Sequence, residues 1–291
     1  MSDSGATNTT SSSDASIGPY NYVPTQWICI LFVSLFGIST AIHLLQAIKF
    51  RMWWLFPTVM LAGVLEILGW SARLWSSISP ALLTPFEIQL VGTIIAPTPF
   101  LAANFLVLGR IINQLGPQYS RLPPKLYAII FCSFDLVCLI IQAVGGAMAA
   151  EAVNTNGNAD EGGNIMLIGV AIQMFAMTLF VICATEFFLR FLKDSPIRKY
   201  AMPMSEEKRE AKLYEWDTMK FLVFGLIFET VFLFIRAVYR TIELEDGWTG
   251  PIISTEVYFN VFDGAMITLA MFTMNLIHPG LFLGRPVTDV V

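Results

Sequence analysis

The stretch "WLFPTVMLAGVLEILGWSARLW", residues 54–75, decides the fold class of this chain. It is almost entirely apolar and long enough to cross the hydrocarbon core of a bilayer, which takes about 20 residues of helix. Within it lie a carboxylate, Glu66, and a guanidinium, Arg73. A charged side chain near the bilayer centre costs about 2.5 to 3.5 kcal/mol, so each needs a partner, a wet cavity or a function. The stretch predicts a membrane-spanning helix with one polar face.

The rest of the chain has the same character. Of its 291 residues, 55% are hydrophobic and 13% charged, and the mean hydropathy is +0.65, which is more apolar surface than a soluble domain of this length can bury. Polar breaks separate seven apolar runs, which we place at Gln26–Ile48, Trp54–Trp75, Phe86–Ile112, Leu126–Ala150, Ile165–Leu192, Asp217–Arg240 and Glu256–Leu281. The sequence predicts an all-α membrane protein, with a seven-transmembrane helix bundle over residues 26–285.

The positive charges fall on alternate connectors. Lys and Arg follow the first, third and fifth runs, whereas the second and fourth connectors hold none. Because basic loops stay on the cytoplasmic side, we expect the N-terminus outside and the C-terminus in the cytoplasm. Residues 1–25 lack an apolar signal-like segment and are expected to form a disordered extracellular tail, and residues 286–291 a short cytoplasmic one. Asn8 begins an Asn-Thr-Thr sequon and is a glycosylation candidate.

Several spans carry polar residues on one helical face. Glu66 and Arg73 lie two turns apart on the second span, so we expect them to be partners of opposite charge within one helix. On the sixth span we expect the same of Glu229 and Arg236, which share their face with Arg240. We predict one polar substrate pocket in the outer half of the membrane, formed by Glu66, Arg73, Asp135, Gln142, Gln173, Glu229, Arg236, Arg240, Glu256, Asn260 and Asp263.

Two interpretations of these charges compete. Each pair can be a buried ion pair that only fixes helix packing. A constellation spread over four or five spans favours function, because ionisable groups inside membranes usually serve one. In the third span, Pro97 and Pro99 each remove a backbone hydrogen bond, so we expect a helix kink there, with freed carbonyls that need polar partners or water.

The sequence also limits which cofactors and which energy sources are expected. All four cysteines lie in spans and predict no disulfide framework, and the only histidines, His43 and His278, lie away from the polar pocket. We therefore expect no metal and no cofactor. Without a G-x-x-x-x-G-K-[ST] loop the chain is not expected to hydrolyse ATP, so any transport is downhill or proton-coupled. The carboxylates that can take up a proton are Glu66, Asp135, Glu229 and Asp263.

Five stretches carry a resemblance to a known family. They are "EILGWSAR" (66–73), "APTPFLAANFLVLGRII" (96–112), "FDLVCLIIQAVGGAM" (134–148), "IRAVYRTIELEDGWTGPIISTEVYFNVFD" (235–263) and "NLIHPG" (275–280). In this order they resemble the fungal lipid-translocating exporter family, seven-span proteins associated with resistance to aminocholesterol. The resemblance covers about Tyr22 to Arg285. It implies a transporter of lipids or amphiphiles in the plasma membrane, with sphingoid long-chain bases, sterol-like or porphyrin-like compounds as substrate classes.

Two other classes stay open. A seven-span receptor-like sensor of amphiphiles has the same architecture, although the chain has no D-R-Y after the third span and no N-P-x-x-Y in the seventh. An intramembrane metal-dependent lipid hydrolase would need a cluster of ligands, typically several histidines. We expect a non-enzymatic transporter whose partners are membrane lipids or amphiphilic small molecules, and no nucleic acid. The oligomeric state does not follow from the sequence.

The charge asymmetry gives a direct test of orientation. We expect "SEEKREAKLYEW", residues 205–216, to be cytoplasmic and the N-terminal tail to be outside. A protease-sensitive tag in the connector should survive protease added to intact cells, whereas the same tag at the N-terminus should be cleaved. Cleavage of the connector tag alone would reverse the orientation.

Overall fold

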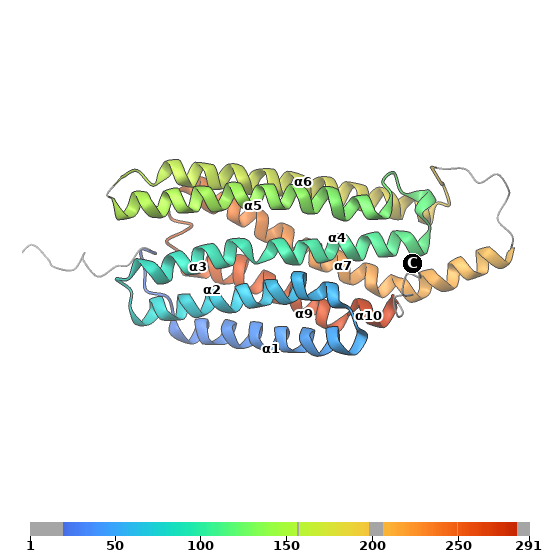
Figure 1. Ribbon diagram of the computed structural model, residues 1–291, viewed down its shortest axis with the longest axis horizontal. Helices are drawn as coiled ribbons and strands as arrows, with labels where there is room; N and C mark the ends of the chain where they lie inside the picture. Colours follow the sequence, from blue (N-terminus) through green and yellow to red (C-terminus); the bar gives the residue numbers. More distant parts are fainter. Residues whose placement is uncertain (1–19, 156, 198–205, 249, 284–291) are drawn as a thin grey trace, which may run out of the picture.

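The structure is a computed structural model that describes residues 20–155, 157–197, 206–248 and 250–283 (Figure 1). Residues 1–19 of the predicted N-terminal tail, with Asn8, and the C-terminal residues 286–291 lie outside this range, whereas residues 20–25 are described and contact the bundle through Tyr22 and Thr25. Every regular element in the described part is helical, and seven helical segments are long and apolar enough to cross a membrane, which confirms the predicted fold class.

The spans follow the predicted order. The first is α1 (Gln26–Phe50). The second joins η2 (Trp53–Leu55), η3 (Phe56–Met60) and α2 (Leu61–Ile78), and the third joins α3 (Leu83–Ile95) and α4 (Pro97–Leu115). The next three are α5 (Pro124–Asn154), α6 (Asp160–Leu192) and α7 (Glu206–Asp246). The seventh joins α8 (Glu256–Phe259), η5 (Asn260–Ala265) and α9 (Met266–Leu276). Short turns at η4 (Pro117–Tyr119) and α10 (Pro279–Phe282) complete the described elements.

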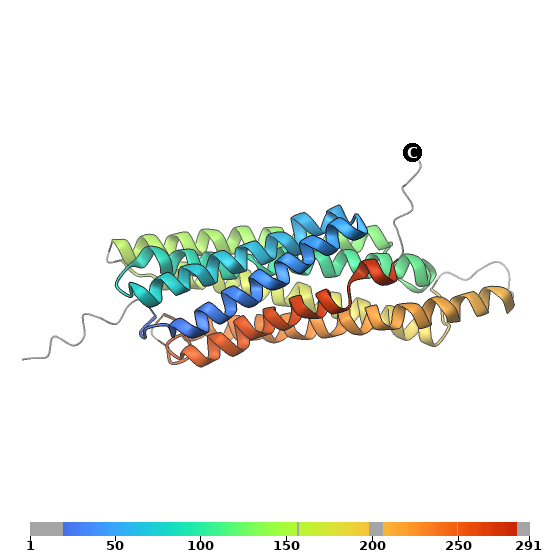
Figure 2. The same ribbon diagram turned by 90° about the horizontal axis from the view of Figure 1, so that it is seen from below.

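The helices form an elongated bundle around α4. In Figure 1, α5 and α6 lie side by side along one edge and α1 along the opposite edge, while α4 lies between them and contacts α2, α5, α6 and α7. Figure 2 shows α1 lying between α2 and the seventh span, and it contacts both. α4 is the most central helix of the bundle, and its buried side chains extend from Pro97 to Leu115.

The two ends of the bundle differ in charge. We call the end where α2, α5 and α7 finish the acidic end, after Asp160, Glu161, Glu245 and Asp246. We call the opposite end the basic end, after Lys49, Arg51, Arg110, Arg121, Lys125, Arg190 and Lys193. In Figure 1 the acidic end is on the left and the basic end on the right, where the first turns of α7 extend past the other helices.

Glycines bring α5 and α6 into backbone contact near the acidic end. A Cβ on Gly145 would lie 2.6 Å from the Met166 backbone nitrogen and 2.7 Å from the Gly162 carbonyl oxygen. A Cβ on Gly162 would lie 2.4 Å from the Ala149 nitrogen. Small residues allow helices to approach this closely inside a membrane, where packing rather than the hydrophobic effect drives association. The neighbouring Gly146 takes no part, because its Cβ would be 3.7 Å from the nearest atom, the Met166 sulfur.

Three spans depart from a continuous α-helix, and in the second the π-helical segment η3 precedes α2. The third is interrupted at Ala96, directly before Pro97, and the seventh contains the π-helical segment η5. π-Helical turns inside α-helices are frequent at functional sites. In η5, Gly264 allows the Trp70 ring to pack on the backbone, since a Cβ would lie 2.4 Å from its Cζ2. This turn carries Asp263.

The glycine contact predicts a position-specific effect on stability. Gly145→Ala should destabilise the bundle by about 1 to 3 kcal/mol, because its methyl group would overlap the backbone of α6. Gly146→Ala is the matched control and should be neutral or mildly stabilising, since alanine favours the helix and has room there. Thermal unfolding in detergent measures both. Equal melting temperatures for the two variants would contradict the contact.

Candidate functional site

Asp263 is the centre of a buried charge cluster between η5 and α7. Its Oδ1 lies 2.6 Å from Arg236 Nε, and its Oδ2 lies 2.9 Å from Arg240 Nη2. Arg240 Nε also donates to Oδ1 at 3.1 Å. Asp263 is fully buried, and both arginines are less than a tenth exposed. One carboxylate is therefore shared by two guanidinium groups inside the span.

Glu243 supplies the second negative charge of this cluster. Its Oε2 accepts from Arg240 Nη1 at 2.8 Å, and its Oε1 accepts from the Tyr239 hydroxyl at 2.7 Å. With Asp263 and Glu243 both ionised, the two arginines are balanced by two carboxylates. Such mutual neutralisation is what allows charges to remain in a low-dielectric interior.

Thr93 links the charge cluster to the break in the third span. In an α-helix its carbonyl would accept from the backbone N–H of residue 97, but Pro97 has none. Arg236 Nη2 donates to this carbonyl instead, and Arg240 Nη2 donates to the Thr93 hydroxyl at 2.9 Å. The arginines thus satisfy a backbone group that the proline leaves free, which a membrane interior otherwise penalises by several kcal/mol.

Glu66 lies beside the cluster but is not paired in it. Its side chain is 1% exposed, and neither carboxylate oxygen has a hydrogen-bond partner in the described part of the chain. Asp263, Arg236 and Arg240 act on it electrostatically. Glu66 thus interacts electrostatically with Arg236 without a direct bond between them.

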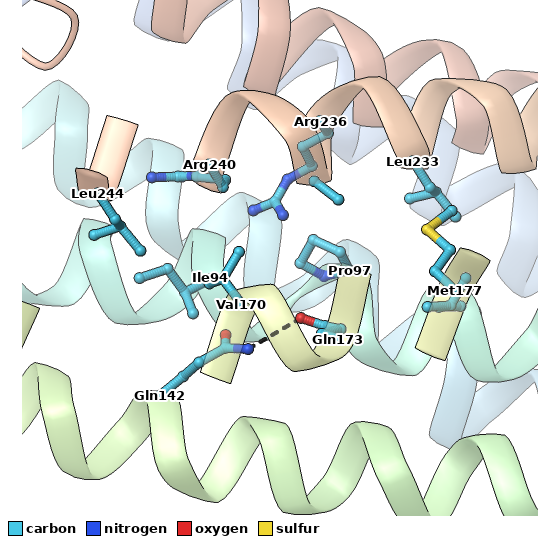
Figure 3. Close-up of a pocket in the computed structure, with 12 residues that line it drawn as sticks. Ile94, Pro97, Gln142, Val170, Gln173, Met177, Leu233, Arg236, Arg240 and Leu244 are labelled. Atoms are coloured by element: carbon cyan, nitrogen blue, oxygen red, sulfur yellow. Dashed lines mark hydrogen bonds between the residues drawn. The ribbon is translucent and has the colours of Figure 1, made fainter. Parts of the chain in front are cut away.

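A small cavity, lined mostly by apolar side chains but with polar groups on two walls, lies on the side of the two arginines that faces α5 and α6 (Figure 3). It measures about 40 Å³ and is bounded by α3, α4, α5, α6 and α7. Arg236 and Arg240 face it from α7, and Gln142 and Gln173 face it from α5 and α6, joined by a hydrogen bond of 3.0 Å. Pro97 forms part of the wall between them. The cavity has room for water but not for a lipid head group in this conformation.

A second polar network closes the acidic end. Arg73 donates to the Tyr22 hydroxyl at 2.7 Å, lies 3.7 Å from Glu256 Oε1, and stacks on the Phe259 ring at 4.4 Å. Glu256 accepts from the backbone nitrogen of Thr25 at 2.7 Å and from its hydroxyl at 2.6 Å. A carboxylate at the N-terminus of α1 favourably opposes the helix dipole. This network joins the first, second and seventh spans.

The expected same-helix partners are wrong. Arg73 pairs with Glu256 rather than Glu66, and Arg236 pairs with Asp263 rather than Glu229. Side chains two turns apart are separated by about 10 Å along a helix axis, so each arginine finds a closer partner on another span, whereas Glu66 and Glu229 form no ion pair with another described residue. The helical face was predicted correctly, but the partner was not.

The remaining predicted pocket residues lie apart from the cavity. Asp135 and Glu229 are buried, but neither lines the cavity nor forms an ion pair with another described residue. Both Asp135 oxygens lack a hydrogen-bond partner in the described part of the chain. Asn260 is buried in η5, and its side-chain oxygen has no partner there either. The predicted single pocket is thus divided into the Asp263 cluster with its cavity, the Arg73 network and two isolated carboxylates.

The sequence analysis did not identify Thr93 as a residue of the site. The signal was available, because the residue four positions before a proline in a span has a free carbonyl that needs a donor. The two histidines lie elsewhere: His43 contacts the Met271 carbonyl at 3.2 Å, and His278 caps α10. Within the described ranges, no group of three or more His, Cys, Asp or Glu side chains is placed to hold a metal ion.

Residues 59–286 match the family model described as "RTA1 like protein". The chain belongs to the RTA1-like family. This confirms the family resemblance, since the matched relatives include the sphingoid long-chain base transporter RSB1 of Saccharomyces cerevisiae, 30% identical over 90% of this chain and 74% of that protein. Protein RTA1 of the same species is 28% identical, over 89% of this chain and 82% of that protein. Protoporphyrin uptake protein 1, also of this species, is 23% identical over 97% of each chain. No solved structure matches this RTA1-like chain.

The Asp263 cluster predicts a strong and non-additive stability effect. Arg240→Ala should cost about 3 to 5 kcal/mol, because it leaves Glu243 and part of Asp263 without their buried partner. Adding Asp263→Ala should cost much less than the sum of the two single changes. As a control, Arg190→Ala removes a partly exposed pair with Glu186 and should cost at most about 1 kcal/mol. Additive losses of thermal stability for the first two changes would argue against the shared carboxylate.

Proposed function

We propose that this chain translocates amphiphiles across a membrane, with the polar head group passing through the cavity beside Arg236 and Arg240. The observation that carries the proposal is a cavity inside the spans that has two guanidinium groups on one wall and two amides on the other, with apolar side chains between them. Such a cavity offers hydrogen bonds to a head group at the depth where a bilayer offers none. In the present conformation it is closed.

An apolar groove adjoins the cavity and suits a hydrocarbon chain. It lies between α6 and α7, measures about 660 Å³ and is lined by side chains such as Phe188, within the range of small-molecule sites. Met177 and Leu233 line the cavity beside the arginines, whereas Thr178 and Phe234, the next residues on the same helices, line the groove. The same seam between two helices thus has polar groups on one side and apolar groups on the other.

The relatives support an amphiphilic substrate. Two of them are named for sphingoid long-chain bases and for protoporphyrin, compounds that combine polar groups with a large apolar body. For this chain we propose a substrate of the same kind: a long-chain base, a porphyrin-like or a sterol-like amphiphile. We also propose that the protein is not an enzyme, that it lies in the plasma membrane, and that its basic end is in the cytoplasm.

A second candidate function is a sensor that binds amphiphiles without moving them. The small volume of the cavity favours it, because a head group cannot pass while the bundle keeps this conformation. The two candidates differ in one measurable property, which is flux. Reconstituted protein that binds a labelled long-chain base but does not accelerate its exchange between leaflets would be a sensor.

Replacing Arg236 tests the transport proposal. In proteoliposomes, Arg236→Ala should slow leaflet exchange of a fluorescent long-chain base by about tenfold or more, because it removes a hydrogen bond from the guanidinium to a hydroxyl oxygen of the base, and a hydrogen bond with one charged partner contributes roughly 1.5 to 3 kcal/mol. Arg236→Lys should recover only part of the rate, since lysine lacks the fork that reaches both Asp263 and Thr93. Arg190→Ala, on the surface of α6, is the matched control and should exchange the probe like the unmodified protein. Equal rates for all variants would remove the cavity from the transport path.

A further inference from the structure

Glu66 is a buried carboxylate that forms no ion pair and, by distance and angle, no hydrogen bond with another described residue. It lies on α2 with 1% of its side chain exposed, and both oxygens are without a hydrogen-bond partner in the part of the chain that the structure describes. A buried ionised carboxylate without a partner is strongly unfavourable, and such a group binds a proton instead. The position of Glu66 thus calls for a reason beyond packing.

The charges around Glu66 are already balanced without it. Arg236 and Arg240 on α7 and Asp263 in η5 interact with it electrostatically. Asp263 and Glu243 neutralise the two arginines through ion pairs of 2.6 to 2.9 Å. An ionised Glu66 would therefore add a surplus negative charge next to Asp263. With a proton bound, Glu66 leaves the cluster neutral.

We propose that Glu66 binds and releases a proton during the transport cycle and thereby couples translocation to proton movement. The inference rests on the proposed function. When Glu66 carries the proton, Arg236 remains on Asp263 and on the Thr93 carbonyl. When the proton passes from the carboxyl oxygen to water, the new carboxylate competes with Asp263 for Arg236. The guanidinium then leaves the cavity wall, and the free carbonyl next to Pro97 loses its donor.

The other carboxylates in the spans do not fit this role. Asp263 and Glu243 are held by arginines, and Glu256 is held by Thr25. Asp135 and Glu229 are buried, but neither lines the cavity nor forms an ion pair with another described residue. Of the carboxylates in the described spans, Glu66 combines an unpaired side chain with electrostatic contact to both cavity arginines.

The test uses purified full-length protein in proteoliposomes. The probe is a fluorescent long-chain base with a quaternary ammonium group, whose charge does not change with pH, and a pH-sensitive dye is trapped inside the vesicles. Valinomycin and potassium hold the membrane potential at zero. For the unmodified protein we expect probe movement to be accompanied by proton movement. If one proton is exchanged per probe, a gradient of one pH unit should shift the probe distribution by up to about tenfold.

Glu66→Gln keeps the shape of the protonated side chain but cannot release a proton. It should remain folded and move the probe down its gradient, with neither proton movement nor a response to pH. The matched control, Asp135→Asn, removes another buried carboxylate. This variant should retain both the proton movement and the response to pH. Infrared spectroscopy provides an independent readout: a carboxylic acid band that changes with pH should disappear in Glu66→Gln and persist in Asp135→Asn.

The outcomes separate the two proposals. The role of Glu66 would be overturned if Glu66→Gln moved protons as the unmodified protein does. It would also be overturned if proton movement were lost in Asp135→Asn and not in Glu66→Gln. Probe movement without any proton movement in the unmodified protein would refute the coupling while leaving translocation intact. Failure of the unmodified protein to move any probe would refute the proposed function and, with it, the coupling.

Discussion

The interaction on which the polar interior depends is the bond from Arg236 to the carbonyl of Thr93. Pro97 leaves that carbonyl without its helical donor, and a membrane interior has no water to replace it. A guanidinium can donate to this carbonyl only if its own charge is balanced. Asp263 balances it, since its Oδ1 lies 2.6 Å from Arg236 Nε. Asp263 in turn lies in a π-helical turn and binds Arg240 as well. A proline in one span is thus stabilised by charges on two others.

This dependence gives the polar residues a structural and a functional role at once. The ion pairs satisfy buried groups, so their removal is expected to harm folding. The same arginines form a wall of the cavity, where they present donors to whatever enters. In a soluble protein these roles would be easier to separate, because water could satisfy a stranded group. Inside a bilayer, a site with charged walls must also be a site with balanced charges.

The sequence predicted much of this arrangement because composition and periodicity are local properties. Seven apolar runs were sufficient to place the spans, and the helical face of Glu66 and Arg73 was correct. Their partners could not be predicted, since pairing depends on which spans adjoin and at what depth. The η5 turn was also missed, because a π-helical turn alters the angular position of the residues that follow, whereas 100° per residue was assumed throughout. Pro97 pointed to a free carbonyl but not to the side chain that satisfies it.

The contacts at the acidic end have a mechanical consequence. Glu256 binds Thr25, Asn21 binds Ser254, Trp248 binds the Ala159 carbonyl, and glycines lock α5 to α6 nearby. The apolar groove between α6 and α7, by contrast, continues to Lys220 and Trp216, toward the basic end. The seam between α6 and α7 is therefore closed by a polar contact at the acidic end and by apolar contacts, such as the Phe191–Trp216 ring pair, toward the basic end, so the acidic end is the natural pivot for a relative motion of these two helices. A small rotation about the acidic end would displace the far ends of α6 and α7 by a larger distance, because displacement grows with distance from the pivot.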